Sequence, residues 1–171
     1  MDLLDRYLDF DVWATHRILD GCAGLAADQL HRRFDIGHET LQATLTHIVR
    51  VMELWTDILY DRAVRPAPPC DLSVADLRRR FDAAAAEFGA RAREVRHRDA
   101  LDEVMLDTVF HPPAEMTRGT VIADVIAHGI THRAEAVHIL ARLGVESTGD
   151  LAGWEWATER AAPRLGLRGM R

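Results

Sequence analysis

The sequence predicts an all-α protein: a four-helix bundle with one long crossover connection and a short C-terminal helix. Four long segments carry apolar residues at the three- and four-residue spacing of amphipathic helices, and glycine or proline separates them. We expect these helices over about residues 2–23, 39–62, 73–98 and 120–143. With 171 residues and 48% hydrophobic content, the chain suits a single domain over residues 1–171 with a sizeable core.

Glycine and proline delimit the first two predicted helices. Gly21 and Gly24 follow the apolar stripe of the first helix and provide its stop signals. A polar connection comes next, and we assign it no helix. The second helix must end before the run from Pro66 to Pro69, which cannot continue a helix.

The third predicted helix has the clearest start. Ser73 is a good N-cap, and Asp76 three residues later completes a pattern that resembles a capping box. The segment 101–119 then alternates apolar and polar residues on either side of His111-Pro112-Pro113. That pattern predicts a short two-stranded excursion with a turn at the prolines.

The fourth predicted helix starts after Gly119, with Thr120 as the expected N-cap, and ends before Gly144. A tail segment over about residues 151–165 contains Trp154 and Trp156. We expect it to form a last short helix that packs on the bundle.

Composition excludes several classes of function. The formal net charge of -6 argues against a general nucleic-acid binder, and no apolar run reaches the roughly 18 residues that span a bilayer. The acidic, amphipathic start of the chain does not resemble a secretory signal, so we expect a cytoplasmic protein with no membrane partner. Cys22 and Cys70 show no motif spacing and are expected to be free thiols.

Three histidines on predicted helices point to a metal site. His128 and His132 are four residues apart, so on a helix they share one face. His47 lies on the apolar stripe of the second predicted helix. If the two helices face each other, all three imidazoles converge on one point. Buried imidazoles need partners, and one metal ion would satisfy all three.

Two carboxylates flank the histidine pair. Asp124 lies one turn before His128, and Glu135 lies three residues after His132. Each is a candidate as a further metal ligand, a partner to an imidazole N–H, or a general base, and an ordinary surface carboxylate is the competing interpretation. Of the other histidines, His138 is expected to face elsewhere and His111, in a turn, is a candidate for the mouth of the site. Those in or beside polar segments are expected to be exposed: His16, His31, His38 and His97.

Three neutral imidazoles without thiolates suit Zn²⁺, Ni²⁺, Fe²⁺ or Mn²⁺. They leave coordination positions for water or substrate, whereas a structural site would more typically have four protein ligands. Three protein ligands instead of four therefore favour a reactive metal ion over a structural one.

Several blocks of the chain resemble the DinB family of metal-binding four-helix bundles. They are Trp13-Ala14 in the first predicted helix, Thr46-His47-Ile48 followed by Trp55, and the block from His128 to Gly144 that begins His-x-x-x-His-Arg. The last block is the most specific, and the pattern covers nearly the whole chain. Family members often continue the pair with Arg-Gly-Gln, where this chain has Arg-Ala-Glu up to Glu135.

The resemblance implies a right-handed bundle with one long crossover, often assembled as a homodimer. It also implies that His47, His128 and His132 bind one divalent metal ion, with zinc or nickel expected first and water completing the shell. Characterised relatives include thiol S-transferases and a thiol-dependent isomerase that use bacillithiol, mycothiol or glutathione.

We therefore expect a metal-dependent enzyme that transfers a low-molecular-weight thiol to a small electrophile. One alternative is a metal-dependent hydrolase. Another is a non-catalytic metal-binding protein of the stress response, acting as an interaction module. Arginines at the mouth of the metal pocket would favour the anionic thiol, and an apolar seal would favour the non-catalytic protein.

Overall fold

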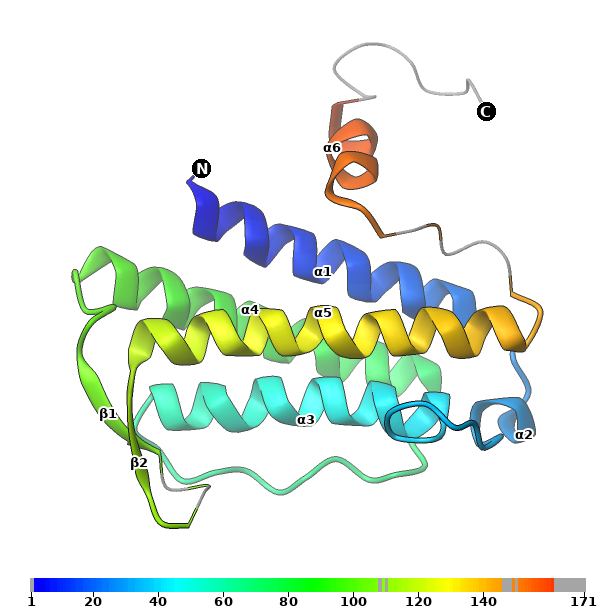
Figure 1. Ribbon diagram of the computed structural model, residues 1–171, viewed down its shortest axis with the longest axis horizontal. Helices are drawn as coiled ribbons and strands as arrows, with labels where there is room; N and C mark the ends of the chain where they lie inside the picture. The colour runs from blue at the N-terminus through cyan, green and yellow to red at the C-terminus, as the bar shows by residue number, and fades with distance from the viewer. Residues whose placement is uncertain (1, 108, 110, 146–148, 150, 162–171) are drawn as a thin grey trace.

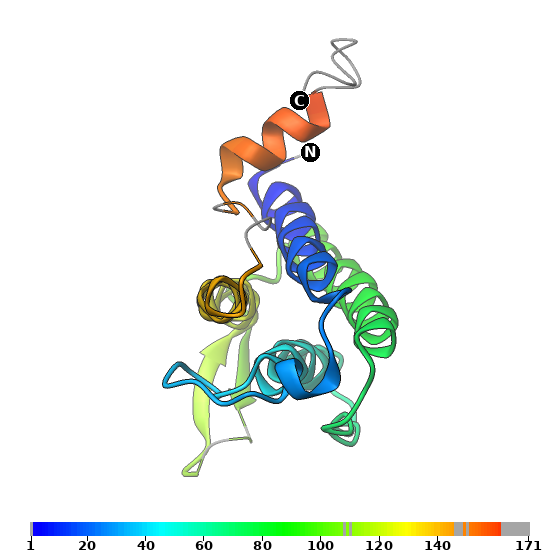
Figure 2. The same cartoon turned by 90° about the vertical axis from the view of Figure 1, so that its right-hand side faces the viewer.

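The computed structural model describes residues 2–107, 109, 111–145, 149 and 151–161. Four long helices form the bundle, as predicted: α1 (Leu3–Cys22), α3 (Leu41–Leu59), α4 (Val74–His97) and α5 (Arg118–Arg142). Figure 2, which looks along the bundle, separates these helices around a common core.

The connections explain the topology. Figure 1 shows α1 and α5 running in one direction and α3 and α4 in the other. Helix α3 contacts α4 and α5, and α1 contacts the same two helices. Because α3 and α4 are parallel, residues 60–73 must return along the length of the bundle, and this segment is the long crossover.

Of the smaller elements, α2 (Ala27–Leu30) and the hairpin lie at the ends of the bundle, and α6 (Gly153–Ala161) packs against α1. Helix α2 falls in the connection to which no helix was assigned, because four residues are too few for an apolar period. Strands β1 (Val104–Asp107) and β2 (Ala114–Thr117) form the expected antiparallel hairpin. Helix α6 confirms the predicted tail helix, of which residues 162–165 lie outside the described part.

The start of α5 differs from the prediction by one turn. The N-cap is Thr117 and not Thr120, since the Thr117 side chain accepts a hydrogen bond from the Thr120 backbone N–H at 3.1 Å. Strand β2 leads directly into α5, so Gly119 lies in the first turn of the helix instead of before it.

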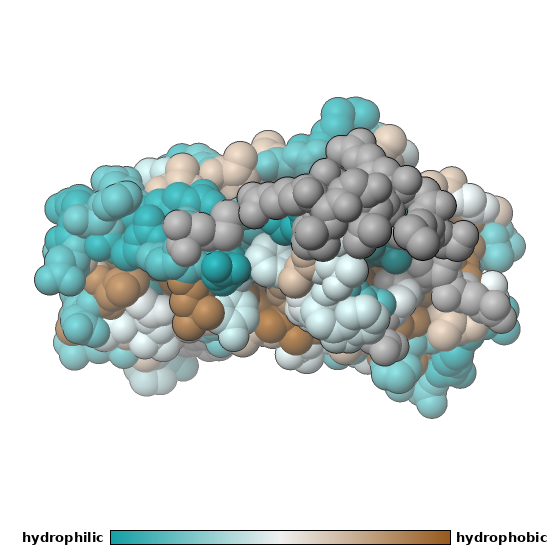
Figure 3. All heavy atoms as spheres, turned by 90° about the horizontal axis from the view of Figure 1, so that it is seen from above, coloured by the Kyte–Doolittle hydropathy of each residue, from teal (hydrophilic) through white to brown (hydrophobic). Residues whose placement is uncertain are grey.

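The core consists of apolar side chains from all four long helices. The largest fully buried ones are Ile18, Leu19, Leu41, Leu45, Leu59, Leu77, Phe81, Phe88, Ile139 and Leu140. On the face shown in Figure 3, apolar patches interrupt a largely hydrophilic surface. Among the residues that the structure describes, no helix has the length and apolar character needed to cross a bilayer.

Buried ion pairs fix α3 against α4 and the crossover. The Arg80 guanidinium on α4 donates to the Glu53 carboxylate on α3 at 2.7 Å, and Glu53 is only 3% exposed. Asp57, also buried, accepts hydrogen bonds from Arg62 and Arg65 of the crossover at 2.7 and 2.9 Å. These contacts hold the crossover along the edge of α3.

A second buried pair joins α5 to α1. Arg133 donates to Asp11 Oδ1 at 2.5 Å and to Thr15 Oγ1 at 3.1 Å, and all three residues are buried. Gly129, one turn earlier on α5, leaves the space for this pair. A Cβ there would lie 2.8 Å from Arg133 Nη1 and 2.9 Å from Asp11 Oδ1. The pair thus sets the face of α5 that packs on α1.

Candidate metal centre

The structure brings His47, His128 and His132 together at the interface of α3 and α5. The Nε2 atoms of His47 and His128 are 2.9 Å apart, and those of His132 and His128 are 3.0 Å apart. All three residues are half-buried. The faces of α5 explain the convergence: residues 129 and 133 point to α1, so residues 128 and 132, about 100° away on the helix, point to α3.

Proton accounting shows that hydrogen bonds alone do not satisfy this cluster. The Glu135 carboxylate, an acceptor only, lies 2.7 Å from His132 Nδ1, so Nδ1 carries the proton and Nε2 presents a lone pair. His128 Nε2 faces that lone pair and His47 Nε2 as well. With a proton, His128 Nε2 would have to share it between two acceptors. Without one, it would face a lone pair on His132.

A metal ion resolves this conflict because it accepts all three lone pairs. Two nitrogens about 2.1 Å from one metal ion are about 3.0 Å apart at a right angle and about 3.4 Å apart at the tetrahedral angle. The separations of 2.9 and 3.0 Å match the right-angle arrangement. The donor set, and the two separations that involve His128, therefore fit a divalent ion bound by three imidazoles.

The surroundings of His47 and His128 keep these two imidazoles neutral, which is the form that binds metal. Burial first, and then the neighbouring histidines, lower the pKa of His47 to about 4. The same two causes, burial and then His132, lower the pKa of His128. At neutral pH both rings are therefore available as donors without first losing a proton.

The two flanking carboxylates occupy different positions. Glu135 contacts His132 directly and fixes its tautomer, which is the arrangement expected of an outer partner to a metal-binding imidazole. Asp124 is exposed, and its charge only partly opposes the lowering of the His128 pKa by burial and by His132. Glu135 is thus the better placed of the two to influence the cluster.

His38 joins the cluster, although its polar surroundings in the sequence predict an exposed histidine. Its ring centroid lies 3.9 Å from that of His47 and 5.0 Å from that of His132. Ligand atoms of His38, His47 and His132 all lie within 4.8 Å of one another. His38 lies in the loop before α3, where no helical period marks a residue's direction, so the sequence carried no signal for this contact.

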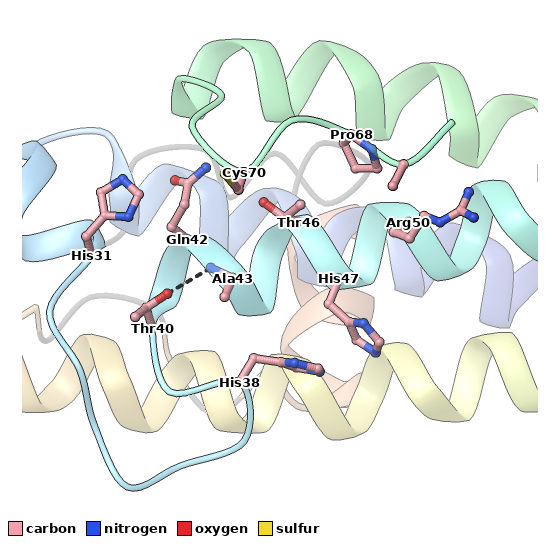
Figure 4. A pocket seen from close by; sticks show the side chains of 11 residues that line it. His31, His38, Thr40, Gln42, Ala43, Thr46, His47, Arg50, Pro68 and Cys70 are labelled. Carbon is pink, nitrogen blue, oxygen red and sulfur yellow. Dashed lines mark hydrogen bonds between the residues drawn. The ribbon is translucent and has the colours of Figure 1, made fainter. Parts of the chain in front are cut away.

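A cavity of about 400 Å³ adjoins the cluster. Figure 4 shows His38 and His47 on its α5 side, and Gln42 and Thr46 pointing from α3 toward the crossover near Cys70 and Pro68. The residues that line it are His31, His38, Thr40, Gln42, Ala43, Thr46, His47, Arg50, Ala67, Pro68 and Cys70. Its volume falls in the range of small-molecule sites.

Comparison with known proteins agrees with this architecture. The family model described as the DinB family matches residues 2–162. A search of curated proteins gave no match. Because the match covers nearly the whole chain, the protein belongs to the DinB family.

Proposed function

From membership of the DinB family and the histidine cluster at the α3–α5 interface, we propose that this protein binds one divalent metal ion through His47, His128 and His132. We further propose that it is an enzyme, which transfers a low-molecular-weight thiol to a small electrophile. Zinc and nickel are the metal ions that we expect first, since both suit neutral imidazole ligands.

The cavity beside the cluster, with Arg50 in its lining, is the observation that carries the enzymatic part of the proposal. Arg50 follows His47 by three residues on α3, so both lie on one side of the helix and line the same cavity. The Arg50 guanidinium donates from Nη1 to the Arg65 carbonyl at 2.9 Å, which anchors it at the crossover. A cationic side chain beside a metal cluster suits an anionic thiol, whereas an apolar seal would suit a non-catalytic protein.

Three residues of the chain would have separate roles in such a reaction. A bound divalent ion would lower the pKa of a thiol that coordinates it, so that the thiolate is available at neutral pH. Glu135 holds the His132 ring with its proton on Nδ1 and its Nε2 directed into the cluster. Arg50 offers positive charge to a carboxylate on the thiol or the electrophile. Asp124, exposed near His128, is the remaining candidate for a base.

Elemental analysis of the purified protein tests the metal centre. We expect about one divalent metal ion per chain, and its loss in His47→Ala, His128→Ala and His132→Ala. His97→Ala is the matched control, because His97 is exposed at the end of α4, away from the cluster. A parent protein that holds no metal after reconstitution, or cluster variants that retain it fully, would contradict the proposal.

Thiol consumption tests the reaction. Metal-loaded protein is incubated with glutathione, mycothiol or bacillithiol and a small electrophile, and free thiol is followed with time. We expect metal-dependent transfer, and a higher KM for the thiol in Arg50→Ala. Metal-dependent hydrolysis of esters or amides without thiol transfer would favour the hydrolase. No turnover with any of these substrates would favour a non-catalytic metal-binding protein.

We also propose that the protein is a homodimer through an apolar groove between α1 and α5. The groove has a volume of about 450 Å³ and includes Leu3, Tyr7 and Ile130, which are 68%, 46% and 44% exposed. Apolar surface of this kind is typical of an interface. Light scattering on a sizing column should give twice the chain mass of 19.2 kDa for the parent and the chain mass for Ile130→Asp. A monomeric parent at micromolar concentration would refute the dimer.

A further inference from the structure

The loop before α3 presents a fourth imidazole to the cluster. His38 is four-fifths of the way along the segment between α2 and α3, and its ring lies 3.9 Å from the ring of His47. Its ligand atom is within 4.8 Å of those of His47 and His132.

The loop is shaped to hold His38 in this place. Gly37 has a left-handed backbone with φ of 45°. The Glu135 carboxylate occupies the space that a side chain at position 37 would need, because a Cβ there would lie 2.1 Å from Glu135 Oε2. Two tight turns follow, in which Glu39 N–H donates to the Ile36 carbonyl and Thr40 N–H donates to the His38 carbonyl, both at 2.8 Å. The glycine therefore lets the loop rest on the carboxylate that orients His132.

The position of His38 differs from that of the other three histidines. Those lie on helices, whereas His38 lies on a loop and, like His47, lines the cavity. Figure 4 shows its side chain between the loop and α5, beside His47. In a four-coordinate metal centre, four permanent imidazoles would leave no position for a substrate.

We propose that His38 is an exchangeable fourth ligand, which closes the metal centre in the resting protein and yields its position to a ligand that enters through the cavity. This inference rests on the proposed three-histidine metal centre. It requires that a ligand from solution competes with His38, so the apparent affinity for that ligand is reduced by the fraction of protein in which His38 is bound.

Cobalt(II) reconstitution tests the proposal, because the visible spectrum of Co²⁺ depends on its ligand number. The proteins compared are the parent, His38→Ala, and His31→Ala as a control that lines the same cavity outside the cluster. Far-ultraviolet circular dichroism verifies that each is folded. Each Co²⁺-loaded protein is then titrated with free imidazole as the probe.

For His38→Ala we expect one bound Co²⁺, an altered visible spectrum and a metal affinity about 10- to 100-fold weaker, the scale of losses at metal-site residues. Free imidazole should bind His38→Ala at least about tenfold more tightly than the parent, as removal of a competing ligand requires. His31→Ala should match the parent in all three measurements.

Two results would overturn the role of His38 while leaving the metal centre intact. One is a His38→Ala variant with the spectrum and imidazole affinity of the parent, which would show that His38 does not coordinate. The other is complete loss of Co²⁺ in that variant, which would make His38 a permanent ligand. A parent protein that binds no Co²⁺ would instead refute the metal centre itself, and the proposal with it.

Discussion

Removing one member of the buried Asp11–Arg133 pair should destabilise the protein more than removing both. Arg133 is 2% exposed and Asp11 is 3% exposed, and their charged atoms are 2.5 Å apart. In Asp11→Ala, the guanidinium would keep one hydrogen bond of 3.1 Å, to Thr15, and no carboxylate. Breaking a buried pair in this way costs about 3–5 kcal/mol, a large part of the 5–15 kcal/mol that typically stabilises a domain.

The double variant Asp11→Leu/Arg133→Met separates the charge from the packing. It leaves no unpaired buried charge, and apolar replacement of buried ion pairs is often neutral or stabilising. In addition, Arg133 Nη2 has no hydrogen-bond partner within the described residues, so the native pair is itself incompletely satisfied. We expect the double variant to lose less than about 2 kcal/mol, which is less than either single variant.

Urea unfolding followed by circular dichroism measures these differences, with the midpoint and the slope fitted separately. Equal losses in Asp11→Ala, Arg133→Met and the double variant would show that packing and not charge dominates. A loss below about 1 kcal/mol in Asp11→Ala would refute the reasoning, because it would mean that water reaches the guanidinium. Metal content of the double variant verifies that α5 still presents its histidines to α3.

Three further outcomes follow from individual side chains. Glu135→Gln should weaken metal binding about 10- to 100-fold, measured by competition with a chelator, because the imidazole it holds loses a charged acceptor. Ellman's reagent should titrate one thiol in the native protein, Cys70, and a second only after denaturation, because burial raises the pKa of Cys22 to about 12. Burial alone would raise the pKa of Asp57, but Arg65 and Arg62 hold this pKa well below the usual range. The stabilisation that the ionised Asp57 gives is therefore present above about pH 4 and is lost as the pH falls. Asp57→Asn should therefore cost about 2 kcal/mol at pH 7 and flatten the loss of stability in acid, as urea titrations at several pH values would show.

Apolar periodicity was sufficient to predict the helices that build the bundle. Each long helix buries a stripe of apolar residues, and the spacing of that stripe is visible in the sequence without knowing which helix packs against it. The same stripes predicted that His47, His128 and His132 approach each other, because all three lie on faces that turn inward. Start and stop signals were less decisive: Thr117 ends β2 and Thr120 follows Gly119, and only the backbone of the hairpin selects Thr117 as the N-cap.

The loop residues of the cluster could not be predicted in the same way. The direction of His38 depends on the left-handed Gly37 and on the turn that follows it, and neither has a periodic signature. The partner of Gly37 is Glu135, which is almost a hundred residues later in the chain. The alternatives for Glu135 likewise stayed open in the sequence, since a carboxylate three residues after a histidine is equally placed for solvent. Contacts between a loop and a distant helix require the fold itself.

The four histidines come from three separate segments, and this has a consequence for folding. Only His128 and His132, which share α5, are neighbours in an unfolded chain, so the complete donor set exists only in the native state. A ligand that binds only the native state stabilises it by about 4 kcal/mol at 1,000 times its Kd. Metal held at this interface would act as a reversible crosslink between α3 and α5. The melting temperature would then report on metal supply, and a cell that runs short of the metal would hold a less stable form of the same protein.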